Sequence, residues 1–116
     1  MAYNEHLFQR IANLAGEYGE IGQIFMFGGV CFTLNGHIVW GVKDDELIVR
    51  VGPDAYERAL AFKHARPFDM TGRPMKGYVF VVPEGFANKQ TLRAWLDRGF
   101  NFVSSLPAKK EKHRRL

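Results

Sequence analysis

The chain has 116 residues, of which 47% are hydrophobic and 14% aromatic, and its formal net charge is +4. This length suits one domain with its own core, and the composition excludes a disordered chain. The single cysteine, Cys31, excludes an intramolecular disulfide. No apolar run approaches the roughly 18 residues that span a bilayer, and the first ten residues lack the signal-peptide pattern. We therefore expect a cytoplasmic protein without a membrane partner.

The first predicted element is a helix over residues 4–18. Leu7, Ile11 and Leu14 recur at the three-and-four spacing that places apolar side chains on one helical face. Asn4 is a suitable N-cap, and Gly19 is a suitable end. The pattern thus predicts an amphipathic helix that packs against a core.

Residues 24–52 predict a three-stranded antiparallel meander, because β-branched and aromatic residues dominate and the apolar period falls to two. Asn35-Gly36 is the dipeptide that a two-residue type I′ hairpin favours, since both central residues need positive φ. The polar residues 43–46 predict a second turn. Alternation places Val30 and Phe32 on one face and Cys31 on the other.

The rest of the chain returns to helical patterns between short strands. Residues 52–63 predict a helix with Pro53 at its first position, residues 65–70 and 78–83 predict strands, and residues 88–106 predict a last helix. The predicted order is α-β-β-β-α-β-β-α. This order favours one α+β domain over residues 1–107, with a largely antiparallel sheet packed by helices.

The net charge is concentrated in residues 108–116, which we expect to be a basic, disordered tail. The rest of the chain carries equal numbers of basic and acidic side chains. Such a tail either aids solubility or binds phosphates with release of counterions. The candidate residues for nucleic-acid binding are Lys109, Lys110, Lys112, Arg114 and Arg115.

No catalytic or metal-binding motif is found. Gly72 and Gly77 have the spacing of a phosphate loop, but Lys76 precedes the second glycine and a strand follows where a helix is required. The four histidines lack ligand spacing, and Cys31 lies within an alternating strand as a small packing residue. We therefore expect no enzyme, no catalytic residue, no metal and no cofactor.

Two non-catalytic motifs stand out. Gly28-Gly29 interrupts a strand, which suggests a bulge or the close approach of another backbone. The loop that precedes the strand at Tyr78 places Arg73 and Lys76 beside an aromatic ring. These three side chains form either a partner-binding patch or the solvated part of a loop shaped by its glycines and proline. The motif positions with a predicted structural role are Met26, Phe27, Gly28, Gly29, Gly72, Pro74, Met75 and Gly77.

The motifs "MFGGVCFTLNGHIVWGV" and "RPMKGYVFVVPEG", together with the closing tryptophan helix and "LPAKK", resemble the N-terminal domain of the TfoX (Sxy) family of competence regulators. The resemblance implies an α+β domain similar to secretion-chaperone-like folds. It also implies a link to transcription of DNA-uptake genes, in concert with the cyclic-AMP receptor protein. Full-length members carry a second, C-terminal domain, and we expect this chain to be a stand-alone N-terminal domain.

These observations favour a non-enzymatic regulatory or protein-interaction domain that is a monomer or a homodimer. We expect a protein partner, for example a component of the transcription machinery. The predicted contact residues are Arg73, Lys76 and Tyr78. The alternatives are a nucleic-acid-binding protein that uses the basic tail and, with the least support, a small-molecule-binding protein or enzyme built around Gly28-Gly29.

Overall fold

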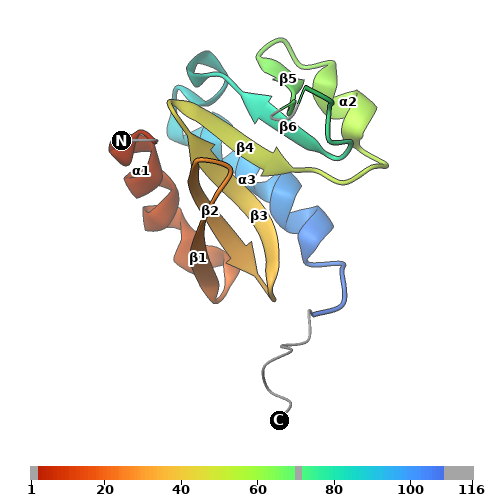
Figure 1. Cartoon of the computed structure of the whole chain (residues 1–116). Coiled ribbons are helices and arrows are strands. Elements are labelled where there is room, and N and C mark those ends of the chain that lie inside the picture. The colour runs from red at the N-terminus through yellow and green to blue at the C-terminus, as the bar shows by residue number, and fades with distance from the viewer. Residues whose placement is uncertain (1–2, 70–71, 109–116) are drawn as a thin grey trace.

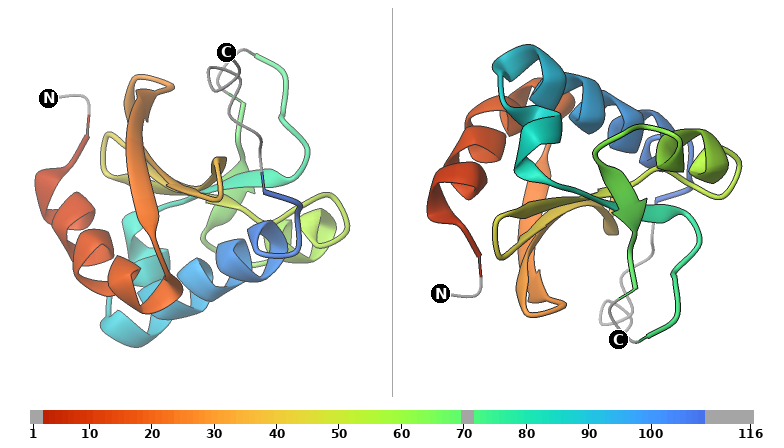
Figure 2. Two further views of the ribbon diagram at one scale, coloured as in Figure 1. Left: turned by 90° about the horizontal axis from the view of Figure 1, so that it is seen from below. Right: turned by 90° about the horizontal axis from the view of Figure 1, so that it is seen from above.

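A computed structural model describes residues 3–69 and 72–108 and contains one six-stranded, fully antiparallel sheet in the order β1-β2-β3-β4-β6-β5. The strands are β1 (Ile21–Met26), β2 (Gly29–Leu34), β3 (His37–Lys43), β4 (Glu46–Arg50), β5 (Ala65–Pro67) and β6 (Tyr78–Val81). Figure 1 shows the β1–β4 meander beside the smaller β5–β6 part. The sheet is strongly twisted, so that the β1–β2 hairpin runs steeply across the direction of β4 and β6 (Figure 2).

The helices cover one face of this sheet (Figure 2). They are α1 (Glu5–Ala15), extended by a 3₁₀ turn η1 (Gly16–Tyr18), then α2 (Tyr56–Leu60), a 3₁₀ turn η2 (Pro83–Phe86) and α3 (Lys89–Val103). Asn4 caps α1, and its side chain accepts a hydrogen bond from the Leu7 N–H at 2.9 Å. Asn88 caps α3 in a reciprocal capping box with Thr91.

The main core lies between this helical layer and the sheet. Val30, Phe32 and Trp40 belong to it, as do Leu92 and Leu96 of α3. Trp40 is fully buried and donates from Nε1 to the Leu96 carbonyl oxygen at 2.9 Å, which ties β3 to α3. The opposite face, called here the outer face, carries a smaller apolar cluster of Ile48, Phe68 and Phe80.

The predicted α+β class, the antiparallel sheet and the Asn35-Gly36 hairpin are confirmed, since these two residues have φ of 54° and 85°. The strand order contains one strand more before α2 than predicted. That strand, β1, was missed because it is an edge strand with five of six residues exposed, and its two-residue turn uses Phe27 and Gly28. Of the two alternatives predicted for Gly28-Gly29, a bulge or the close approach of another backbone, the bulge is wrong, because the register shift lies between Phe32 and Thr33.

The second helix is shorter than predicted. It begins at Tyr56, and Pro53 lies in the preceding turn, so the prediction that Pro53 occupies the first helical position is wrong. Only Tyr56 and Ala59 of this helix are buried. Because packing of an apolar face supplies most of the stability of a short helix, two buried residues stabilise little more than one turn. None of the helices within the described ranges is both long and apolar enough to cross a membrane.

Candidate functional site on the outer face

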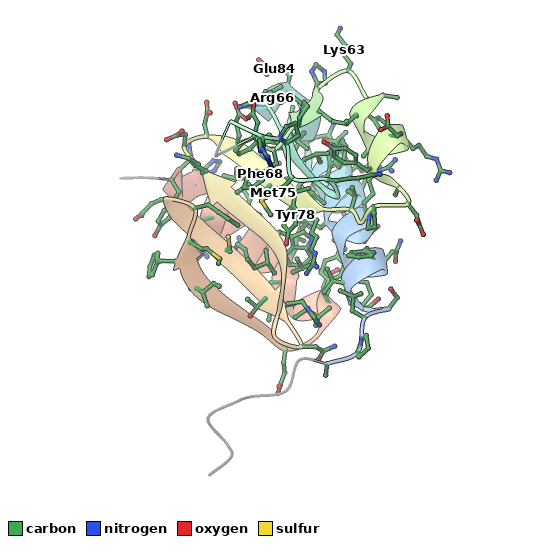
Figure 3. The ribbon with its side chains drawn as sticks, turned by 45° about the vertical axis from the view of Figure 1, so that its right-hand side comes forward. Lys63, Arg66, Phe68, Met75, Tyr78 and Glu84 are labelled. Atoms are coloured by element: carbon green, nitrogen blue, oxygen red, sulfur yellow. The ribbon has the colours of Figure 1, made fainter. Side chains whose placement is uncertain are left out.

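The two sequence motifs lie far apart in the chain but meet on the outer face. Phe27, in the β1–β2 turn, packs edge-on against Phe68, with ring centroids 5.0 Å apart. Met75 and Tyr78 pack against the same cluster, and Figure 3 shows them gathered beside Phe68. We call the residues Phe27, Phe68, Met75 and Tyr78, together with the cations Arg73 and Lys76 of the same loop, the outer-face site.

The β1–β2 turn places Phe27 at this site through an unusual backbone conformation. Phe27 has a φ of 61° and Gly28 a φ of 76°, the values of a type I′ turn. Asparagine or glycine normally occupies the first of these positions, because a bulky residue at positive φ costs about 1 kcal/mol or more. In this protein the strained conformation directs the ring of Phe27 onto Phe68. Strain of this kind is typical of functional positions.

Gly28 supplies a positive φ to the turn, whereas Gly29 is needed because there is no space for a side chain. A Cβ at Gly29 would overlap the carbonyl oxygen of Val42 and lie 3.2 Å from the Cα of Lys43. The predicted close approach of another backbone is therefore confirmed at Gly29. The neighbouring strand β3 occupies the space that a side chain would need.

The loop before β6 is fixed at its base by backbone hydrogen bonds. The Met75 N–H donates to the Phe68 oxygen at 2.9 Å, and the Tyr78 N–H donates to the Met75 oxygen at 3.1 Å. The Gly77 oxygen accepts from the N–H groups of Val51 at 2.8 Å and Gly52 at 3.0 Å. Met75 packs against the cluster while Pro74 and Lys76 on either side are exposed, so the loop has a half-buried anchor and a solvated rim.

Arg73 and Lys76 lie on this rim. Both are exposed, and neither forms an ion pair with any residue that the structure describes. Arg66, on β5, differs because it pairs with Glu46 at 2.7 Å and with Asp69 at 3.7 Å. The rim cations can therefore pair with acidic groups on another molecule without breaking an internal ion pair.

Tyr78 is half-buried at the back of the site. Its ring lies 5.7 Å from that of Phe68, and the Arg50 guanidinium lies 5.4 Å from its centroid. Burial raises the pKa of Tyr78 from its ordinary value of 10.0, and the charge of Arg50 opposes this shift. Tyr78 thus supports the apolar floor, whereas Arg73 and Lys76 are available at the surface.

The Cys31 thiol lies beneath this face of the sheet, and burial raises its pKa from 9.0 to about 11. The folded protein then keeps the thiol protonated between pH 9 and 11, where the unfolded chain loses the proton. Because the folded state binds more protons in this window, the free energy of unfolding falls as pH rises from 9 to 11.

We expect Cys31→Ala to reduce this alkaline loss of stability. The measurement is the fall in the urea midpoint from pH 8 to pH 10.5, which should be smaller for the variant than for wild type. Tyr18, whose pKa burial also raises, contributes equally to both proteins. The Cys31 thiolate is one of the charges that raise the pKa of Tyr78, so its removal reduces the alkaline loss at Tyr78 in the same direction. Parallel pH profiles for the two proteins would contradict the assignment. In native wild type, a thiol-specific disulfide reagent should react only after unfolding.

The structure thus brings together parts of two predicted motifs. Phe27 and Met75 meet on the same apolar cluster, a contact that no spacing in the sequence predicts. Phe68 was missed, because one phenylalanine after a three-residue strand gives no periodic signal. The tail residues Lys109, Lys110, Lys112, Arg114 and Arg115 lie outside the described residues, so their role in nucleic-acid binding stays a prediction.

Away from the outer-face site, a hollow with a volume of about 400 Å³ lies between the α2–β5 connection and α3. Phe62 and Trp95 form its apolar wall, with ring centroids 5.4 Å apart. The Arg98 guanidinium covers both rings, at 4.3 Å from the Phe62 centroid and 5.2 Å from the Trp95 ring. Within residues 3–69 and 72–108, no three acidic, histidine or cysteine side chains are grouped as a metal site.

Comparison with known protein families gave a match that spans both motifs. The sequence matches the TfoX N-terminal domain family over residues 13–103. Searches of the curated proteins and of the solved structures found no match. The family match covers most of the chain and contains both the β1–β2 turn and the loop before β6. The chain that joins these motifs on the outer face therefore belongs to the TfoX N-terminal domain family.

Proposed function

We propose that this chain is a non-enzymatic, regulatory protein-interaction domain that binds its partner through the outer-face site. The observation that carries this proposal is the contact between Phe27 and Phe68, which joins two separate motifs on one surface. The positive φ of Phe27 costs about 1 kcal/mol or more, and strain of this kind is typical of functional positions, which supports a role for this residue in recognition.

The chemistry of the site suggests the chemistry of the partner. Arg73 and Lys76 offer two cations without internal partners among the described residues, beside apolar area from Phe27 and Met75. A protein surface that combines carboxylates with an apolar side chain fits this arrangement. Since the family resemblance implies competence regulation, we place the partner among proteins of the transcription machinery, in the cytoplasm.

The double variant Arg73→Ala/Lys76→Ala tests the proposal. We expect it to fold with wild-type stability, because both side chains are exposed, and to lose the partner in pull-down from a source lysate. Recovery of the partner by wild type should fall as salt is raised, because charge attraction between exposed groups is screened.

The matched control is Arg58→Ala/Lys63→Ala, which removes two exposed cations near α2 and the same total charge. It should recover the partner as wild type does. If the two double variants recover equal amounts of the same proteins, the outer-face site is not the contact surface. If both lose the partner equally, net charge and not the site determines binding.

A further inference from the structure

The two edges of the sheet differ in how they are protected. At one edge, β5 has three residues and includes Pro67, which lacks an N–H, and the charged Arg66. Such features prevent a further strand from pairing. At the other edge, β1 has six residues with no charge and no proline. The sheet therefore ends in one blocked edge and one open edge.

The open edge is also apolar. Among the described residues, four large hydrophobic side chains are exposed, and three of them belong to β1: Ile24 (41%), Phe25 (80%) and Met26 (43%). The fourth is Phe62. A long, uncharged and apolar edge strand is a template for pairing with another strand.

The β1–β2 turn determines which backbone groups are free at this edge. A two-residue type I′ loop closes on a hydrogen-bonded pair, here Met26 and Gly29, so alternate residues of β1 bond to β2. The N–H and C=O groups of Ile21, Gln23 and Phe25 therefore point away from the sheet. These three residues offer a complete ladder to a second antiparallel strand.

We propose that a second copy of this chain pairs with β1, antiparallel and about a two-fold axis at Gln23, to form a continuous sheet across a homodimer. In this register Phe25 of each copy lies opposite Ile21 of the other, and Ile24 lies opposite Gly22. Large side chains meet smaller ones and no like charges are opposed, so the strand is complementary to itself.

A hollow beside Ile21 fits this register. Its volume is about 220 Å³, and its lining includes Ala12, Ala15, Gly16, Ile21 and Phe32, together with the polar Gln23. Phe25 is on the same face of the sheet as Ile21, because both alternate with the outer-face residues of β1. The two-fold axis thus brings the exposed ring of Phe25 to the hollow of the other copy. A centre at Ile24 would instead place Phe25 directly opposite Gln23, where it would lose the apolar cross-strand contact with Ile21.

This interface goes beyond the proposed function, because Phe25 faces the helical side and the outer-face site lies on the other side of the sheet. Partner binding through Arg73 and Lys76 can fail while the dimer forms, and the reverse also holds. The two inferences are therefore tested separately.

The test is the molar mass by sedimentation equilibrium from low micromolar to millimolar concentration. We expect a monomer–dimer equilibrium for wild type. Phe25→Lys should weaken dimerisation by about a hundredfold or more, because it replaces a buried aromatic anchor with a charge. Phe62→Lys, which alters the exposed phenylalanine that lies outside β1, should dimerise as wild type does.

A second variant addresses the backbone ladder. Gln23→Pro removes an outward-pointing N–H and leaves the bonds between β1 and β2 intact, so it should fold and remain monomeric. In wild type, hydrogen exchange at Ile21, Gln23 and Phe25 should slow with increasing protein concentration, while exchange at Ile24 does not change. A wild type that stays monomeric, or a dimer without this protection, would overturn the proposal.

Discussion

Gly29→Ala is expected to lower the free energy of unfolding by about 3 kcal/mol or more, the upper range for overpacking a site that cannot relax. The new methyl group would meet the backbone of Val42 and Lys43, and backbone in a central strand cannot move aside as a flexible side chain can. To relieve the overlap, β2 must separate from β3 near the turn that holds Phe27. We therefore expect the contact of Phe27 with Phe68 to loosen as well.

Urea denaturation followed by circular dichroism measures this change, and Gly16→Ala is the matched control. Gly16 follows α1 with a φ of −62°, and a Cβ there would meet nothing within 4 Å. The control should raise the free energy of unfolding by about 0.5 to 1 kcal/mol, because alanine restricts the unfolded chain. Similar stabilities for the two variants would show that β2 and β3 are not closely packed at Gly29.

Local rules predicted much of this fold correctly. The Asn35-Gly36 turn, the Asn88 cap and the apolar stripe of α3 each depend on residues within a few positions of one another. The chemistry of those residues restricts the backbone directly, so the sequence alone was sufficient. The same rules failed for β1, where tertiary pairing with β2 overrides a weak pattern that contains glycine and glutamine.

The candidate site was harder to predict, because it depends on contacts between distant segments. Arg73 and Lys76 were identified from their loop, but no periodicity relates Phe27 to Phe68. Their contact requires the twist of the sheet, the positive φ of Phe27 and the return of the loop at Met75. A phenylalanine in a type I′ turn breaks the local preference for that position. Such a departure is itself a sequence signal for function once the turn is identified.

The contact between β3 and α3 explains why the helical layer is so close to the sheet. Trp40 is fully buried and donates its indole N–H to the Leu96 oxygen. Gly99 allows this approach, because a Cβ at that position would lie 2.9 Å from Trp40 Nε1 and 3.0 Å from the Val39 oxygen. Two residues far apart in the sequence thus set the distance between the layers. Removal of the larger one should destabilise the whole domain.

Trp40→Ala is expected to lower the free energy of unfolding by about 3 to 5 kcal/mol, through lost transfer energy and the cavity left in the core. Trp40→Phe keeps an aromatic ring but loses the hydrogen bond and part of the volume, so we expect a loss of about 1 to 3 kcal/mol. Phe62→Ala, at a position 43% exposed, should cost less than about 1 kcal/mol.

Urea midpoints for the three variants give the order of their stability losses, and hydrogen exchange shows which elements are destabilised. In Trp40→Ala, the increase in exchange rate over wild type should be larger for the amides of α3 than for those of the β1–β2 hairpin, because the helix loses its anchor to β3 first. A Trp40→Ala variant that loses no more stability than Phe62→Ala would mean that α3 is held by its remaining apolar contacts. In that case the indole contact would not set the distance between helix and sheet.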